Sequence, residues 1–217
     1  MRYFKDRAEA GMLLAEQMTD YQRLNCAVLA IGEGGAAVGA EIAKKIHASL
    51  YMLTVEHLTL PRELVPLASM SSAGTFTYNH AMSAADLEVV SVESRTVIDQ
   101  LRLETFQKLN RIISKDGVID KNLLKRHVVI VVSDGIANGL SLDVAADFLK
   151  PVLTKELIIA TPLCSEDVME RVRSLSSNFL CLNMIESDFP ITHYYDENTL
   201  PDHDEVVEQM KNISLSW

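Results

Sequence analysis

Short, continuous apolar runs alternate with segments of helical periodicity along this chain, and that alternation constrains the fold more than any other feature. Three runs are typical of strands buried on both faces, at residues 26–31, 50–55 and 127–132. Two weaker runs follow at residues 157–160 and 179–182. Apolar residues at helical spacing mark five further segments, at residues 6–19, 36–46, 91–114, 141–149 and 165–175. Strands that alternate with crossover helices predict a mostly parallel, doubly wound α/β sheet.

The length and the charge limit what such a sheet can carry. A chain of 217 residues suits one domain with a sizeable core, so we expect a single domain over residues 1–217. Its 20 basic and 30 acidic residues give a net charge of −10, and residues 186–210 contain eight of the acids and no Lys or Arg. A chain this acidic is a poor partner for nucleic acid or for an anionic membrane surface.

The sequence predicts no membrane span, no disulfide framework and no metal site. The longest apolar run, residues 26–31, is too short to cross a bilayer, and residues 1–7 lack the apolar core of a signal peptide. The three cysteines match no disulfide framework or metal spacing. Asp202, His203 and Asp204 lie near His193 in one acidic segment without the spacing of a metal site. We therefore expect a cytoplasmic protein without a bound metal.

Two glycine-bearing turns follow predicted strands, at residues 31–39 and 132–141. Ligands of an open parallel sheet bind beyond the carboxyl ends of its strands, where the strand order reverses. Glycine allows a sharp turn and a close approach of the backbone to a ligand. The helix that follows presents free N–H groups and a partial positive charge. Both turns are therefore candidate phosphate sites.

The first turn, taken alone, resembles a dinucleotide-binding fingerprint. Gly32, Gly34 and Ala37 match G-x-G-x-x-A, and Glu56 ends the next predicted strand 24 residues after Gly32. This spacing permits an oxidoreductase with a nicotinamide or flavin cofactor. A purely structural glycine turn is the alternative.

The second turn resembles the signature by which type I phosphoribosyltransferases bind phosphoribosyl diphosphate. That signature has four apolar residues, two acids, two apolar or small residues, a Thr-Gly pair and a closing Thr. In this chain apolar residues precede Ser133 and Asp134, and the turn continues through Asn138 and Gly139 to Ser141.

The resemblance extends over residues 4–210. Phe4-Lys5-Asp6-Arg7 is similar to the start of uncharacterised bacterial phosphoribosyltransferases, Gly34-Gly35 to their pyrophosphate loop, and Tyr194-Tyr195 to their C-terminal segment. It implies a type I phosphoribosyltransferase-like parallel sheet flanked by helices, with a flap at residues 61–90 and a C-terminal cap at residues 183–217. It also allows a homodimer, since these folds often pair through the helices that flank the sheet.

The resemblance also implies a role for each residue of the two turns. The phosphate- and ribose-binding set is Ser133, Asp134, Gly135, Ile136, Ala137, Asn138, Gly139, Leu140 and Ser141. Backbone N–H groups of residues 136–140 and the Ser141 hydroxyl would hold a 5-phosphate, and Asp134, the catalytic candidate, would hold the ribose. Glu33, Gly34 and Gly35 form the pyrophosphate loop. An active enzyme would use Mg²⁺ carried by the diphosphate substrate. Helix capping is the alternative role for Ser141.

Three departures from the family pattern weaken the expected activity. Ser133 replaces an acid, Glu33 replaces an arginine, and His57 lies where a lysine is expected. One unit charge pair at ~4 Å is worth about 4 kcal/mol at an effective dielectric of ~20, so the change at Glu33 is adverse unless its side chain turns outward and stabilises the helix start. We expect a small phosphorylated ribose ligand, either phosphoribosyl diphosphate or a nucleotide monophosphate, with transfer weakened or lost. A non-catalytic regulatory protein on the same fold is the alternative.

Overall fold

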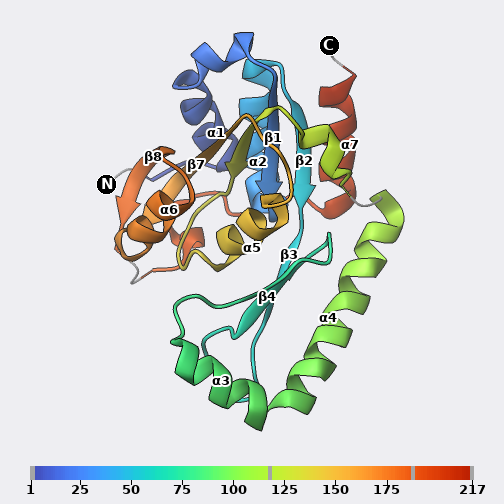
Figure 1. Ribbon diagram of the computed structural model, residues 1–217. Helices are drawn as coiled ribbons and strands as arrows, with labels where there is room; N and C mark the ends of the chain where they lie inside the picture. The colour runs from blue at the N-terminus through green and yellow to red at the C-terminus, as the bar shows by residue number, and fades with distance from the viewer. Residues whose placement is uncertain (1–2, 117–118, 187–188, 216–217) are drawn as a thin grey trace.

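A five-stranded parallel sheet forms the centre of the molecule, with the strand order β2-β1-β6-β7-β8 (Figure 1). The computed structural model describes residues 3–116, 119–186 and 189–215. The strands are β1 (Cys26–Ile31), β2 (Ser49–Leu53), β6 (Val128–Val132), β7 (Glu156–Ser165) and β8 (Asn178–Ile185). Each pairs in parallel with its neighbours, which confirms the predicted α/β sheet. The strand order reverses between β1 and β6, so the two glycine turns lie side by side at the switch point.

Helices cover both faces of this sheet. One face carries α1 (Arg7–Glu16), α2 (Gly32–Ile46) and α7 (His203–Ser214), and the other carries α5 (Leu140–Leu149) and α6 (Met169–Leu175). Val128 and Ile130 pack in the first core, whereas Val129 and Val131 pack in the second. Because alternate residues of β6 enter different cores, the strand is a continuous apolar run. Short 3-10 helices connect the elements, at η1 (Thr19–Arg23), η2 (Lys121–Leu124), η3 (Glu166–Val168) and η4 (Ile191–Tyr194).

A second lobe contains the expected flap at residues 61–90. It contains an antiparallel sheet of β3 (Val55–Leu58), β4 (Ala68–Ser71) and β5 (Phe76–Tyr78), followed by α3 (Ala84–Glu93) and α4 (Arg95–Asp116). The predicted strand at residues 50–55 is therefore too long, since β2 ends at Leu53 and β3 begins at Val55. The lobe has its own small core around Leu58, Met70 and Leu109. The expected flap thus has regular structure.

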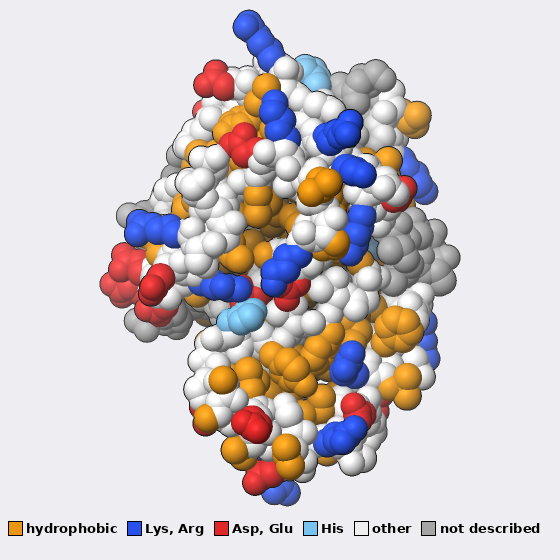
Figure 2. Space-filling model, in the orientation of Figure 1, with side chains coloured by type: hydrophobic (Ala, Val, Ile, Leu, Met, Phe, Trp, Pro, Cys, Tyr) orange, Lys and Arg blue, Asp and Glu red, His pale blue; other side chains and the backbone are white. Residues whose placement is uncertain are grey.

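Apolar side chains gather on the surface of this lobe (Figure 2). Val89 and Val92 of α3 are exposed, as are Leu103 and Phe106 of α4. Clusters of this kind often mark a binding surface. The homodimer stays a prediction.

A polar contact fastens the lobe to the main sheet, and it carries a first testable prediction. The buried Thr77 hydroxyl on β5 donates to Asp147 Oδ2 on α5 at 2.6 Å. Partial burial alone would raise the pKa of Asp147, but hydrogen bonds from Lys150 and Thr77 hold that pKa below its usual value. Since the folded pKa is lowered, the stability is present above the ordinary value of 3.8 and is lost as the pH falls through the folded value.

We expect Thr77→Val to lower the free energy of unfolding by about 1–2 kcal/mol at neutral pH, because it leaves the Asp147 carboxylate with one donor fewer. The difference from the unsubstituted protein should shrink as the pH falls below 3.8. Urea unfolding at a series of pH values measures both effects. Thr77→Ser keeps the hydroxyl and serves as the control. Equal stability of Thr77→Val and the unsubstituted protein at pH 7 would contradict the prediction.

The N-terminal segment of the described chain packs against the expected cap region beside β7. Phe4 forms a parallel bridge with Tyr195, and both residues are buried with Tyr194 and Leu163. The expected cap region therefore packs its tyrosines into the fold, while α7 lies against α2 and begins with a capping box of Asp202 and Glu205. None of the described helices is both long enough and apolar enough for a membrane span.

Candidate functional site

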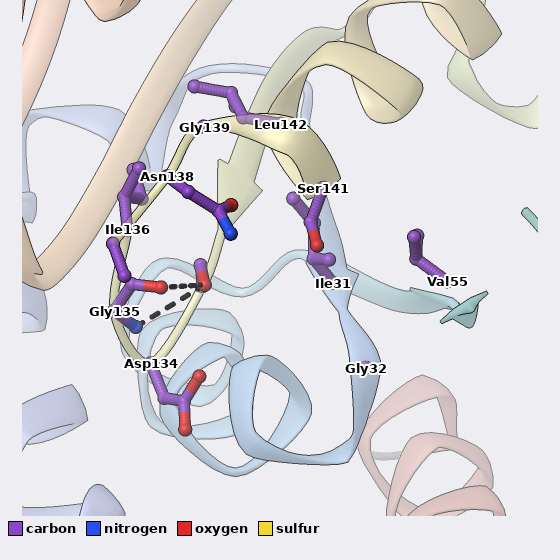
Figure 3. A pocket seen from close by; sticks show the side chains of 12 residues that line it. Ile31, Gly32, Val55, Asp134, Gly135, Ile136, Asn138, Gly139, Ser141 and Leu142 are labelled. Atoms are coloured by element: carbon purple, nitrogen blue, oxygen red, sulfur yellow. Dashed lines mark hydrogen bonds between the residues drawn. The ribbon is translucent and has the colours of Figure 1, made fainter. Parts of the chain in front are cut away.

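A cavity of about 190 Å³ opens at the carboxyl end of β6 (Figure 3). This volume is below the ~300–1,000 Å³ of sites for drug-sized ligands. Its lining is Ile31, Gly32, Val55, Ser133, Asp134, Gly135, Ile136, Ala137, Asn138, Gly139, Ser141 and Leu142. The cavity therefore lies at the switch point and gathers eight of the nine residues predicted for the phosphate and ribose site.

The loop backbone leaves three N–H groups free rather than the predicted five. The Ile136 N–H donates to the Leu163 carbonyl at 2.9 Å, and the Leu140 N–H donates to Asn138 Oδ1 at 3.2 Å. The N–H groups of Ala137, Asn138 and Gly139 have no acceptor among the described residues. Residues 137–139 are therefore the part of the loop that remains available to a ligand.

Gly139 fixes where the following helix begins. It precedes α5 as the N-cap residue with φ +71°, a conformation that glycine adopts more readily than other residues. Because α5 starts at Leu140, Ser141 lies inside the first turn, so the helix-cap interpretation of Ser141 is wrong. Figure 3 shows its side chain at the cavity, where it is one of the lining residues.

His57 connects the lobe to this helix start. It lies on β3, with Nδ1 at 2.6 Å from Ser69 Oγ and Nε2 at 3.4 Å from Ser141 Oγ. Desolvation lowers the pKa of His57 below 6.5, and the neighbouring Glu56 opposes this only in part. The ring is therefore neutral at pH 7 and does not replace the positive charge of a lysine.

Ser133 is occupied within its own turn. Its hydroxyl donates to the Gly135 carbonyl at 3.0 Å and accepts from the Gly135 N–H at 3.3 Å (Figure 3, dashed lines). A serine that closes a local turn in this way contributes to loop geometry rather than to a charged site.

Asp134 is bound by a buried arginine, Arg7, the first residue of α1. Arg7 Nε donates to Asp134 Oδ2 at 2.7 Å, and Arg7 is only 4 % exposed. The Tyr195 hydroxyl donates to the Asp134 backbone carbonyl at 2.6 Å. Burial, followed by the charge of Asp134, raises the pKa of Tyr195, which keeps this hydroxyl protonated as a donor. Sequence reasoning placed Arg7 only within the family resemblance and missed its contact with Asp134.

The glycines of the first turn are required for close packing rather than for an open loop. The Asp134 carboxylate lies against Gly34, leaving no room for a β-carbon there. A β-carbon on Gly35 would lie 2.7 Å from the Val132 carbonyl oxygen. The expected break at residues 32–35 is therefore absent, because α2 begins at Gly32 directly after β1.

Glu33 faces α7 and is not among the cavity-lining residues of the described chain. Its Oε1 lies 3.5 Å from His203 Nδ1, the first residue of α7. No side chain caps the start of α2, but the carboxylate of Glu33 lies in its first turn, where a negative charge is favourable.

The dinucleotide fingerprint does not form a cofactor site in this fold. Gly32, Gly34 and Ala37 lie within α2, and no loop separates them from the helix. Glu56 lies on the antiparallel β3 and pairs with Lys108 Nζ at 2.8 Å, so its carboxylate is not at the end of a parallel strand.

Comparison with known proteins identifies the relatives of this arrangement. No family model matches the chain. It is 26 % identical over 215 residues to proteins of two Mycobacterium tuberculosis strains, H37Rv and CDC 1551, that carry the name "Putative phosphoribosyl transferase". The match covers 95 % of this chain and 46 % of those proteins, so the chain spans about half the length of these curated relatives.

Solved structures share the fold. The protein TT1426 from Thermus thermophilus has a TM-score of 0.72 at 21 % identity, covering 98 % of this chain and 99 % of its own. A hypothetical protein from Neisseria gonorrhoeae, solved with bound ppGpp, has a TM-score of 0.51 at 12 % identity, covering 97 % and 96 %. The named relatives confirm the resemblance to phosphoribosyltransferases, and the solved structures confirm the expected fold class.

Proposed function

We propose that this chain binds a small phosphorylated ribose through its 5-phosphate, in the cavity at the end of β6, and that transfer from phosphoribosyl diphosphate is weakened or lost. The similarity to named phosphoribosyltransferases supports the class of ligand. The free backbone donors of the cavity loop support binding, and the absence of Lys and Arg from the described lining residues supports the loss of transfer.

The free N–H groups of residues 137–139 carry the binding part of the proposal. The residues that carry them line the cavity together with Ser141, at the N-terminal end of α5. Backbone donors at a helix start are a common phosphate site, since they combine hydrogen bonds with the positive end of the helix dipole. A cavity of about 190 Å³ is small, which favours a phosphate with its sugar over a larger ligand.

The lack of a cationic side chain among the described lining residues carries the part of the proposal that concerns transfer. No Lys or Arg is among the described lining residues, and His57 is neutral at pH 7. Glu33 occupies the place where the resembled family has an arginine, and it faces α7. A diphosphate leaving group needs positive charge where its own charge develops. The site therefore favours a binding protein over an efficient transferase.

Calorimetric titration with ribose 5-phosphate, AMP and phosphoribosyl diphosphate tests the proposal. We expect Ser141→Ala to lower the affinity for all three about tenfold, because one hydrogen bond to a charged phosphate is lost. Ser91→Ala on α3 removes a hydroxyl outside the cavity lining and should leave the affinity unchanged. The absence of binding by any 5-phosphate, or rapid release of pyrophosphate with a nucleobase acceptor, would contradict the proposal.

A further inference from the structure

Asp134, the acid that the family resemblance assigns to the ribose, is already paired with Arg7 inside the protein. The family resemblance implies a magnesium ion carried by the diphosphate and acids that hold the ribose hydroxyls. Asp134 is the only acid among the described lining residues of the cavity. Whether the site fits a metal-bound substrate therefore depends on what the Asp134 carboxylate contacts.

The environment of Arg7 keeps its guanidinium on Asp134. Besides the 2.7 Å contact of Nε with Asp134, Nη1 donates to Asn198 Oδ1 at 2.9 Å. The guanidinium also lies over the Tyr195 ring, 4.6 Å from its centroid. Three partners from two parts of the chain, the cavity loop and residues 195–198, thus fix a buried cation beside the cavity.

The start of α2 also lies against the Asp134 carboxylate. Gly34 lies in the first turn of α2, and its missing side chain gives the Asp134 carboxylate room to lie against the helix. The positive end of the helix dipole and the arginine stabilise the same negative charge. The carboxylate therefore contacts both the guanidinium and the start of α2.

A divalent cation fits poorly in this arrangement. Mg²⁺ is usually held by one or two carboxylates together with substrate phosphates and several waters. Here the one lining carboxylate is paired with a guanidinium, which repels a cation, and the Ser133 hydroxyl is used within its turn. The residues present do not fit the metal that the family resemblance implies.

We infer that Arg7 is the resident cation of this site and that the chain binds its phosphorylated ligand without a divalent metal. Arg7 acts through Asp134: by neutralising that carboxylate, it removes the repulsion that a free acid would exert on a phosphate in the same cavity. Arg7 is thus a positioning residue, and Asp134 is not a ribose ligand. The inference rests on the proposed function, since it concerns the same cavity.

Titration with phosphoribosyl diphosphate, beside ribose 5-phosphate, in EDTA and in MgCl₂ tests the inference on the unsubstituted chain, because the family resemblance places the Mg²⁺ on the diphosphate. We expect dissociation constants that agree within about twofold, since the protein supplies its own cation. Binding that needs Mg²⁺, with an affinity at least about tenfold weaker in EDTA, would overturn the inference and leave the proposed function standing. No binding in either buffer would instead overturn the proposed function, and the inference with it.

Asp134→Asn gives a second, independent readout. The amide oxygen still accepts from Arg7, but the negative charge near the phosphate is gone, so we expect about three- to tenfold tighter binding, with the gain reduced at high salt. An acid that held the ribose would give weaker binding in this variant, which would overturn the inference. Asp20→Asn in η1 makes the same charge change away from the cavity and should leave the affinity unchanged. Thermal unfolding confirms that each variant is folded; if Asp134→Asn is not, the comparison of EDTA with MgCl₂ decides alone.

Discussion

Arg7→Met is expected to lower the free energy of unfolding by about 3–5 kcal/mol, because it removes one partner of a buried ion pair and leaves Asp134 without its donor. Arg7 is 4 % exposed, and the Asp134 side chain is 21 % exposed, so water replaces the lost contact only in part. The substitution also removes the hydrogen bond to Asn198 and the contact with the Tyr195 ring. Urea unfolding monitored by circular dichroism measures the change.

Lys5→Met provides the matched control for this prediction. Lys5 lies two residues away, is well exposed and is 3.7 Å from Glu197, so its loss should cost less than about 1 kcal/mol. The double variant Arg7→Met/Asp134→Asn should recover part of the stability, because no unpaired charge remains. A loss below about 1 kcal/mol for Arg7→Met would show that the buried pair is not what holds the loop.

Gly35→Val is expected to destabilise the protein by about 3 kcal/mol and to weaken ligand binding at the same time. Its β-carbon would lie 2.7 Å from the Val132 carbonyl oxygen, which is a strand backbone atom and does not rotate away. The end of β6 must then separate from α2, and the cavity loop follows Val132 directly. Thermal unfolding and titration with ribose 5-phosphate measure the two effects on one sample.

Glu33→Val controls for the cost of a β-branched residue in the same helical turn. Its side chain is 32 % exposed and faces His203, so we expect a loss below about 1 kcal/mol. If Gly35→Val were as stable as Glu33→Val, then α2 and β6 would not be in the close contact described above.

The central sheet was predictable because its strands are buried on both faces. Such strands are uninterrupted apolar runs, and β1 and β6 match the predicted residues almost to their ends. The lobe was not predictable on the same basis. β4 and β5 have four and three residues, and Ser69, Ser71 and Thr77 are buried polar side chains that interrupt any apolar pattern.

The position of the site followed from the sequence, but its electrostatics did not. Strand ends and glycines placed residues 132–141 at a candidate phosphate site, and that loop lines the observed cavity. The contact between Arg7 and Asp134 spans 127 positions, and no local pattern marks it. The orientation of Glu33 toward His203 spans 170 positions and was equally hidden. Contacts of this kind depend on how α1 and α7 pack, which periodicity alone does not specify.

The hydrogen bonds that Arg7 and Tyr195 donate to Asp134 have a consequence for the order in which the chain folds during synthesis. During synthesis, the loop leaves the ribosome 61 residues before Tyr195, whose hydroxyl holds the Asp134 carbonyl. The backbones of Phe4 and Lys5 likewise form their hydrogen bonds only after residues 194–197 have been synthesised. β1, β2 and β6 are complete long before that point, so the parallel sheet has its first partners while the loop is still unfastened. A nascent chain released too early would therefore have an ordered centre and an unfinished binding site.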